Sequence, residues 1–441
     1  MKPNRCLGAN GVAAIALVVA LASLTAAALT SCEYFDPFNP LSRGPGGSGS
    51  SITWTRVIRP SPSLAGAGNG DDVGMCIQQT EDHGFIIAGY MQRQVGGNFD
   101  VWLVKTDSLG NMEWDAIYGE GGNDIGYYVE QTSDGGYILV GSKEIDRGGG
   151  LWDADLWLIK IKPDDQEQGA VDWQRLYGES GTEEIGCCVR CTEDGGYIIT
   201  GQKENTTTDY FNLWLVKTHE DGSHDWNRTF GGSSSAYGAC VSQTIHDSGY
   251  VTGYVVAGVL WSDSSENAYL VKTDPAGDLD GAWNPNPKDF GAFDEPDYAY
   301  YVQQTYDGGY ILAGETRSFG AAGMDALIIK LDASGNLDNQ WETNPKTLHS
   351  ADLGGHDRAN CVQQTYDGGY ILAGMTHYND QDAWLIKTDA YGNMLWDEFF
   401  GDVGYEEAES VRETVDGGYI LAGRTNSDPG GFNLYLVYYK P

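Results

Sequence analysis

Val302 to Gly314 reads VQQTYDGGYILAG, and the same thirteen letters return from Val362 to Gly374. Looser copies end at Gly89, Gly141, Gly201, Gly258 and Gly423, which makes seven in all. Seven near-identical copies cannot each be a separate active site, so the stretch is architecture, and a repeat of this kind indicates a solenoid, a propeller or an array. Stacked repeats share one continuous core, so we expect the repeats to form a single body.

Each repeat divides into four short apolar runs, which in the first repeat are Met75–Thr80, Phe85–Gly89, Val101–Lys105 and a run around Trp114. Short runs rich in Ile, Val, Tyr and Trp and bounded by Asp, Gly and Asn predict strands. Turns such as Asp134-Gly135-Gly136 predict tight hairpins, because glycine adopts the positive φ that these turns need. Four strands per repeat around an axis are typical of a β-propeller blade.

The two ends of the repeat array complement each other. The seventh repeat runs through Asn433–Val437 to Pro441 without a Trp-containing fourth strand, whereas Ser51–Trp54 stands alone before the first full repeat. We therefore expect an all-β, seven-bladed β-propeller of four-stranded antiparallel blades, with the N-terminal strand completing the last blade. Closure of this kind leaves no terminal blade with an unpaired edge. The fourth repeat is irregular, with ten residues rather than five from Thr244 to Tyr254.

The first fifty residues have a different character from the repeats. Lys2 and Arg5 precede an apolar run from Gly11 to Leu29, as in an export signal. The following Leu29-Thr30-Ser31-Cys32 resembles a bacterial lipobox, which implies cleavage before Cys32 and lipidation of that cysteine. An uncleaved anchor is the alternative, because the run is long enough to span a bilayer. The expected organisation is a signal peptide over 1–31, lipidated Cys32 and a flexible tether over 32–50, and the propeller over 51–441.

The chain is strongly acidic, with 63 Asp and Glu against 26 Lys and Arg and a formal net charge of −37. This balance disfavours nucleic acid and anionic lipid surfaces as partners, since both need clustered Lys and Arg. Together with the signal it predicts an exported monomer that meets the membrane only through its lipid. In a Gram-negative host Glu33, which follows the cysteine, favours the outer membrane.

A carboxylate stands eight residues before the motif threonine in six repeats, and the fourth repeat has Ala236 there. A ring of carboxylates at the channel entrance could hold a hard cation such as calcium. We favour a local role, in which each carboxylate accepts backbone N–H bonds and fixes the turn into the first strand, because single carboxylates around a wide axis cannot share one ion. These residues are Asp72, Asp124, Glu184, Asp297, Asp357 and Glu406.

Two further columns are interpreted as packing. Equivalent positions in separate blades are not expected to form disulfides, so the cysteines of one column should be small buried side chains. They are Cys76, Cys188, Cys240 and Cys361. Cys187, Cys188 and Cys191 do not predict a metal site, because neighbouring strand residues point to opposite faces. The tryptophan found once in each repeat is expected to pack between blades rather than to stack on a ligand.

The connections between second and third strands, and between consecutive repeats, vary in length and should lie on one face of the propeller. Loops on a rigid scaffold carry binding function, although variable loops also tolerate drift. Aromatic residues in these connections are our candidates for a recognition surface. They are Phe99, Tyr210, Trp261, Phe319 and Tyr378.

No catalytic residues are predicted. The seven histidines fall at unrelated columns, and no G-x-S-x-G, H-E-x-x-H or P-loop motif is present. The sequence therefore favours a non-enzymatic binding or scaffolding module for a protein or glycan. The alternative is an envelope enzyme, either a carbohydrate-active propeller or a pyrroloquinoline-quinone-type dehydrogenase. Such an enzyme predicts a cluster of charged residues at the channel mouth, which the repeat columns do not indicate.

The consensus D-G-G-Y-I-L-A-G, D-x-W-L-V/I-K-T-D and G-N-x-x-W resembles a group of exported bacterial and archaeal β-propeller repeat proteins, which are often lipoproteins. The resemblance covers Ser51 to Pro441 and implies a seven-bladed propeller at the cell envelope, but no reaction. A fainter similarity links Asp107–Trp114 to the docking turn of pyrroloquinoline-quinone propellers. This similarity implies that the enzyme, in the alternative interpretation, is a quinone-dependent dehydrogenase.

Overall fold

The computed structural model describes residues 52–441 apart from 62–69, 94–96, 149–150, 165, 209, 233, 247, 262–264, 293, 321–322, 351–354, 378–380, 402–403 and 428–430. The expected signal peptide, Cys32 and the tether lie outside these residues. In the part of the chain that the structure describes, every regular element is a β-strand. No helix there is long and apolar enough to cross a membrane.

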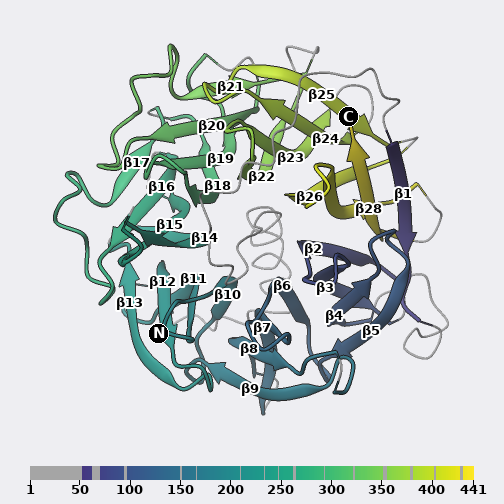
Figure 1. Ribbon diagram of the computed structural model, residues 1–441. Coiled ribbons are helices and arrows are strands. Elements are labelled where there is room, and N and C mark those ends of the chain that lie inside the picture. Colours follow the sequence, from purple (N-terminus) through teal and green to yellow (C-terminus); the bar gives the residue numbers. More distant parts are fainter. Residues whose placement is uncertain are drawn as a thin grey trace, which may run out of the picture.

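Seven four-stranded antiparallel sheets surround one axis (Figure 1), as the seven repeats predict. We number the blades in chain order. From the axis outward, blades 1 to 3 are β2 (Asp72–Gln79), β3 (Phe85–Gln92), β4 (Phe99–Thr106) and β5 (Met112–Tyr118); β6 (Asp124–Gln131), β7 (Tyr137–Gly148), β8 (Leu151–Ile161) and β9 (Val171–Tyr177); and β10 (Glu184–Cys191), β11 (Tyr197–Asn205), β12 (Tyr210–Thr218) and β13 (His224–Phe230).

Blades 4 to 6 follow the same order around the ring. They are β14 (Ser235–Ile245), β15 (Val251–Trp261), β16 (Glu266–Thr273) and β17 (Lys288–Phe290); β18 (Asp297–Gln304), β19 (Tyr310–Thr316), β20 (Asp325–Leu331) and β21 (Lys346–Leu348); and β22 (Arg358–Gln364), β23 (Tyr370–His377), β24 (Gln381–Thr388) and β25 (Met394–Phe400). Blade 7 is β26 (Glu406–Glu413), β27 (Tyr419–Thr425), β28 (Asn433–Lys440) and β1 (Ile52–Ile58).

The N-terminal strand closes the ring, which confirms the prediction from the unequal ends of the repeat array. β1 pairs antiparallel with β28, and Trp54 stands opposite Tyr438. On the axial side, the backbone N–H of Val415 in blade 7 donates to Gln79 Oε1 in blade 1 at 3.0 Å. The closing blade is therefore joined to its neighbour as the other blades are.

The two faces of the propeller differ in the connections that they carry. Connections from second to third strands and from one blade to the next lie on the face where the innermost strands begin, and we call it the loop face. The opposite face carries the two short hairpin turns of each blade, and we call it the turn face. Blade 4 has the longer first hairpin that its sequence indicates, because the pairing continues to Ile245 and Val251.

The prediction that every fourth strand contains a tryptophan is wrong for two blades. Trp283 and Trp341 precede the three-residue strands β17 and β21 instead of lying in them. In each case an asparagine amide replaces the missing strand by pairing with the backbone of the third strand. The Asn344 amide, for example, receives the Lys330 N–H at 3.2 Å and donates to the Lys330 carbonyl at 2.6 Å. Asn286 pairs with Lys272 in the same way.

The tryptophans pack between blades, as the sequence predicts. Trp114 lies against Tyr137 of the next blade with ring centroids 6.2 Å apart, and Trp173 lies against Tyr197 at 6.0 Å. The same pairing continues around the ring as far as Trp396 and Tyr419, at 5.8 Å. This packing is part of the buried apolar core that joins the blades.

Candidate binding site at the channel entrance

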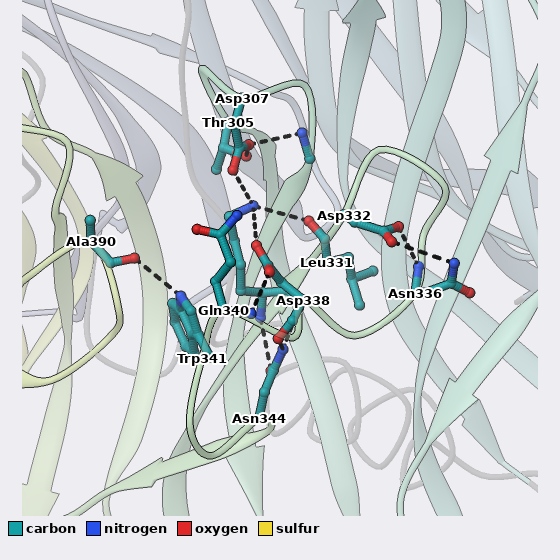
Figure 2. A network of polar contacts seen from close by, with 12 residues as sticks. Thr305, Asp307, Leu331, Asp332, Asn336, Asp338, Gln340, Trp341, Asn344 and Ala390 are labelled. Atoms are coloured by element: carbon teal, nitrogen blue, oxygen red, sulfur yellow. Dashed lines mark hydrogen bonds and ion pairs between the residues drawn. The ribbon is translucent and has the colours of Figure 1, made fainter.

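Residues repeated on the turn face have structural roles. A buried lysine near the end of the third strand in blades 1 to 6 reaches back to the first hairpin turn or its neighbourhood. In blade 5, Lys330 Nζ lies 2.8 Å from Asp307 Oδ2 and donates to the Leu331 carbonyl at 3.1 Å. Figure 2 shows Asp307 also accepting from Thr305, and Trp341 donating to Ala390 of the next blade. In blade 7 the hydroxyl of Tyr438 donates to the turn aspartate Asp416 at 2.6 Å.

The acidic column of the loop face makes local hydrogen bonds. Asp357 accepts the Ser350 N–H at 2.9 Å and the Thr376 hydroxyl at 2.5 Å, so it joins the connection before its strand to the second strand. Asp124 accepts two backbone N–H groups, each at 3.0 Å. Burial raises the pKa of Asp124 to about 6 and that of Asp72 to about 7. Within the described residues, no group of three or more His, Cys, Asp or Glu is placed to hold a metal ion.

Two residue positions that follow the acidic column in each first strand are apolar on one side of the propeller and polar or charged on the other. The residue that follows the acidic column is Val73, Ile125 and Ile185 in blades 1 to 3, but Arg358 and Glu407 in blades 6 and 7. Two residues further along, blades 1 to 3 carry Met75, Tyr127 and Cys187, whereas blades 6 and 7 carry Asn360 and Glu409. These positions are structurally equivalent, because the first pairs with the residue after the motif glycine and the second is the extra residue of a β-bulge in every one of these blades.

The half formed by blades 1 to 3 is apolar. Val73, Met75, Tyr127 and Ile185 form a separate buried cluster, with aromatic side chains packed at its edge. Such a cluster stabilises the fold by removing apolar surface from water.

The half formed by blades 5 to 7 contains a network of charges, which we call the charged cluster. Its centre is the fully buried Glu407. Glu407 accepts from Arg424 Nη2 at 2.6 Å, from the Tyr405 hydroxyl at 2.7 Å, from Asn360 Nδ2 at 2.9 Å and from Arg358 Nη2. The members of the charged cluster are Tyr300, Glu315, His356, Arg358, Asn360, Tyr405, Glu407, Glu409 and Arg424.

Glu407 and Glu409 lie side by side in the charged cluster but differ in ionisation. Burial raises the pKa of Glu407, but the positive charges of Arg358 and Arg424 outweigh it and lower that pKa to about 2. Burial and the negative charge of Glu407 hold the pKa of Glu409 well above its ordinary value. The two adjacent buried carboxyl groups therefore ionise at separate pH values, with Glu407 losing its proton first.

His356 is the exposed end of the charged cluster. Its Nε2 lies 2.7 Å from Glu315 Oε2, and the hydroxyl of Tyr300 donates to the other oxygen of Glu315. The His356 side chain is 45% exposed, whereas that of Glu315 is 6% exposed. Burial raises the pKa of Glu315, but the His356 hydrogen bond and the positive charge of Arg358 outweigh it, so that pKa lies below its ordinary value.

Several buried polar atoms of the charged cluster make no hydrogen bond to the protein. They are Nε of Arg358, Nε of Arg424, Oδ1 of Asn360 and Oε1 of Glu409. Arg424 Nε and Glu409 Oε1 lie 4.0 Å from each other. Buried polar atoms are normally paired, so the donor Arg358 Nε and the acceptor Asn360 Oδ1 are the atoms of the charged cluster best placed to contact water or a polar ligand. The sequence expectation that the columns show no charged cluster at the channel mouth is therefore wrong. A column-by-column comparison of the first strands would have found it.

The four aromatic candidates among the described residues lie on blades 1, 3, 4 and 5. Phe99 packs against Tyr90 with ring centroids 5.1 Å apart, and Trp261 packs against Tyr237 at 5.2 Å. Tyr210 and Phe319 are exposed, but they lie on blades 3 and 5. Tyr378 lies outside the described residues.

The turn face carries exposed apolar side chains that the sequence analysis missed. The residue after the motif threonine is Tyr306 in blade 5, Tyr366 in blade 6 and Val415 in blade 7, and Tyr366 is 70% exposed. In blades 1 and 3 this residue is Glu81 or Glu193. The difference between the two halves of the ring thus extends to the turn face.

Comparisons with known proteins support the fold. No family model matches the chain, and no curated protein matches it. Among solved structures, a puromycin hydrolase mutant is similar with 11% identity and a TM-score of 0.51, over 82% of this chain and 51% of that one. A periplasmic gluconolactonase of Pseudomonas aeruginosa is similar with 12% identity and a TM-score of 0.48, over 76% and 90%. The chain thus spans about half the length of the puromycin hydrolase, and identities this low show a shared propeller fold alone.

Proposed function

We propose that this protein is a binding or scaffolding propeller of the cell envelope, related to the exported repeat propellers that its motifs resemble. A lipid on Cys32 would hold it at the membrane, in the outer membrane of a Gram-negative host. It would recognise a protein or glycan partner through the loop face, with the charged cluster at the centre of the contact.

One observation carries this proposal. The recurring lysine, aspartate and tryptophan columns are used to fix turns, loops and blade packing, whereas polar residues that differ from blade to blade concentrate at the loop-face end of the channel. Because blades 1 to 3 form the same strands with Val73, Ile125 and Ile185 at equivalent positions, the fold does not require Arg358 and Glu407 there. Residues that the fold does not require are the ones free to serve recognition.

The chemistry of the charged cluster favours a glycan within the proposed pair of partners. Its unpaired atoms include both donors and acceptors, and Tyr90 and Phe432 stand beside the neighbouring apolar half. Sugar hydroxyls both donate and accept, and the C–H faces of sugars pack on aromatic rings. A purely anionic or cationic ligand would satisfy only one kind of unpaired atom.

The test measures binding of the mature protein to a glycan panel and to envelope extracts. His356→Ala and Tyr405→Phe should weaken binding at least tenfold, which corresponds to about 1.4 kcal/mol. Tyr366→Ser on the turn face is the matched control and should bind as the unmodified protein does. Loss of binding with Tyr366→Ser alone would place recognition on the turn face and contradict the proposal.

A second candidate is an envelope enzyme, and the pairing of His356 with Glu315 favours it. A half-exposed imidazole held by a buried carboxylate is an arrangement used in general base catalysis. Of the two enzyme forms, this pairing favours the carbohydrate-active one over the quinone-dependent dehydrogenase. Turnover of a glycan substrate that His356→Ala abolishes, with a pH profile that shifts in Glu315→Gln, would replace the binding proposal by this one.

A further inference from the structure

Two buried arginines lie deeper in the propeller, on the innermost strands of blades 3 and 7. Arg190 and Arg412 occupy the same column, one residue before the last position of β10 and β26. In blades 5 and 6 this column holds Gln303 and Gln363, whose Oε1 atoms accept backbone N–H groups of the next blade at 2.9 and 2.8 Å. The arginines depart from this structural role.

The Arg190 side chain reaches across several blades, as only a residue near the axis can. Its Nε donates to the Val241 carbonyl of blade 4 at 3.2 Å, and its Nη2 lies 3.4 Å from the Tyr301 hydroxyl of blade 5. Its guanidinium carbon lies 4.6 Å from the ring centroid of Tyr128 in blade 2.

Arg412 approaches the same region from the other side of the ring. Its Nη1 donates to the Val411 carbonyl and lies 3.4 Å from Cys361 Sγ. Arg190 Nη2 also lies 3.9 Å from Cys240 Sγ of blade 4, so the two arginines contact blades 4, 5 and 6 from opposite sides. Both positive charges act on the Tyr301 hydroxyl and on the Cys240 thiol, as expected if the guanidinium groups face one buried region.

Hydrogen bonding and charge are both unbalanced in this region. Nη1 of Arg190 and both Nε and Nη2 of Arg412 make no hydrogen bond, although both side chains are at least 97% buried. Glu130 Oε2 lies 3.9 Å from Arg190 Nη1, whereas Arg412 has no carboxylate partner among the described residues. A buried charge without a counter-charge lowers the stability of the folded protein, because the ion has lost its water and has gained no partner.

We propose that a small monovalent anion of chloride size binds on the propeller axis between the guanidinium groups of Arg190 and Arg412. Such an ion supplies the missing negative charge and accepts from the unpaired nitrogens. A small ion is proposed because both arginines are almost fully buried. This site is separate from the charged cluster, so it stands or falls independently of the proposed function.

The test exploits the glutamines that blades 5 and 6 carry at the same position. The thermal midpoint of the full protein should rise by roughly 2–4 °C and then saturate as chloride replaces gluconate at constant ionic strength. Arg412→Gln installs the residue that blades 5 and 6 accommodate, so it should fold and lose this response. Arg175→Gln, on the outer strand β9, is the control and should keep it.

Crystals grown in bromide should show an anomalous peak between the two guanidinium groups of the unmodified protein and none in Arg412→Gln. Equal midpoints in chloride and gluconate, with only water between the arginines, would overturn the proposal. A midpoint that ignores chloride but falls in Cys240→Ser would also overturn it. That result would assign the counter-charge to the Cys240 thiol, whose pKa is raised by burial but lowered overall to about 7 by the Cys188 hydrogen bond and by Arg190.

Discussion

At the channel entrance, blade 1 buries Val73 where blade 7 buries Glu407. Both residues stand at the same register, opposite the residue that follows the motif glycine of the second strand. The apolar side stabilises the protein by burial alone, whereas the charged side must offset the cost of removing ions from water. Apolar replacements for a buried ion network are often neutral or stabilising. The comparison therefore teaches that the fold does not require a charge at this position, because blade 1 forms the same strand pairing with a valine.

The largest effect is expected from Glu407→Gln, which removes the central carboxylate and leaves Arg358 and Arg424 without their counter-charge. The free energy of unfolding should fall by about 3–5 kcal/mol, because removing one member of a buried ion pair leaves the other charge buried and unpaired. Urea denaturation near neutral pH measures this. Glu193→Gln, on an exposed turn of blade 3, is the control and should change stability by less than about 0.5 kcal/mol. A similarly small loss in Glu407→Gln would show that the charged cluster is well hydrated.

An intermediate effect is expected on the apolar side. Val73→Ala removes buried methyl groups from the cluster with Met75 and Tyr127, and it should cost about 2 kcal/mol from lost burial and the residual cavity. Unlike the loss in Glu407→Gln, this cost should not depend on pH, because no titratable group is removed. A cost that varied with pH between 5 and 8 would contradict this and would mean that Val73 contributes to the burial of the neighbouring Asp72, whose pKa is about 7.

A smaller effect of opposite sign is expected from Glu409→Gln. The pKa of Glu409 is higher in the folded protein than in the unfolded chain, so above about pH 4.5 the folded form holds a proton that the unfolded form has lost. Stability from this group is thus lost as pH rises. The glutamine cannot ionise, so the variant should gain stability relative to the unmodified protein as the pH rises from 5 to 8. Urea midpoints at both pH values measure the gain, and an unchanged difference would contradict the raised pKa.

The smallest effect on stability is expected from His356→Ala. The imidazole is nearly half exposed, so the free energy of unfolding should change by less than about 0.5 kcal/mol. A large loss of stability would make His356 a structural member of the charged cluster rather than its exposed end. Denaturation midpoints beside the binding assay separate these outcomes.

The residues that build the fold could be read from the sequence because they repeat. The two copies of VQQTYDGGYILAG gave the period, and the unpaired stretch at Trp54 predicted the closure with Tyr438 that the structure confirms. Features that depend on residues outside the repeat pattern were not predicted. The asparagines that replace part of the fourth strands in blades 4 and 5 looked like loop residues, because a side chain that mimics a strand has no periodic signature.

The candidate site was missed for the same reason. Arg358, Glu407 and Arg424 come from three strands of two blades, and each looks like an isolated exception in its own repeat. The expected aromatic surface stays a prediction, and the structure adds a packing role for two of its members. Phe99 and Trp261 looked available in the sequence, but each packs on a neighbouring tyrosine.

The sequence by itself thus determined the seven blades, the closed ring and the packing roles of the repeated side chains, because strand period and turn chemistry are local properties. Only the tertiary structure decided which exceptions meet. Packing of consecutive blades brings Arg358 of blade 6 to Glu407 of blade 7, and the curvature of the ring brings Arg190 of blade 3 to Tyr301 of blade 5. Such contacts depend on distances between blades, and no local pattern in the chain records those distances.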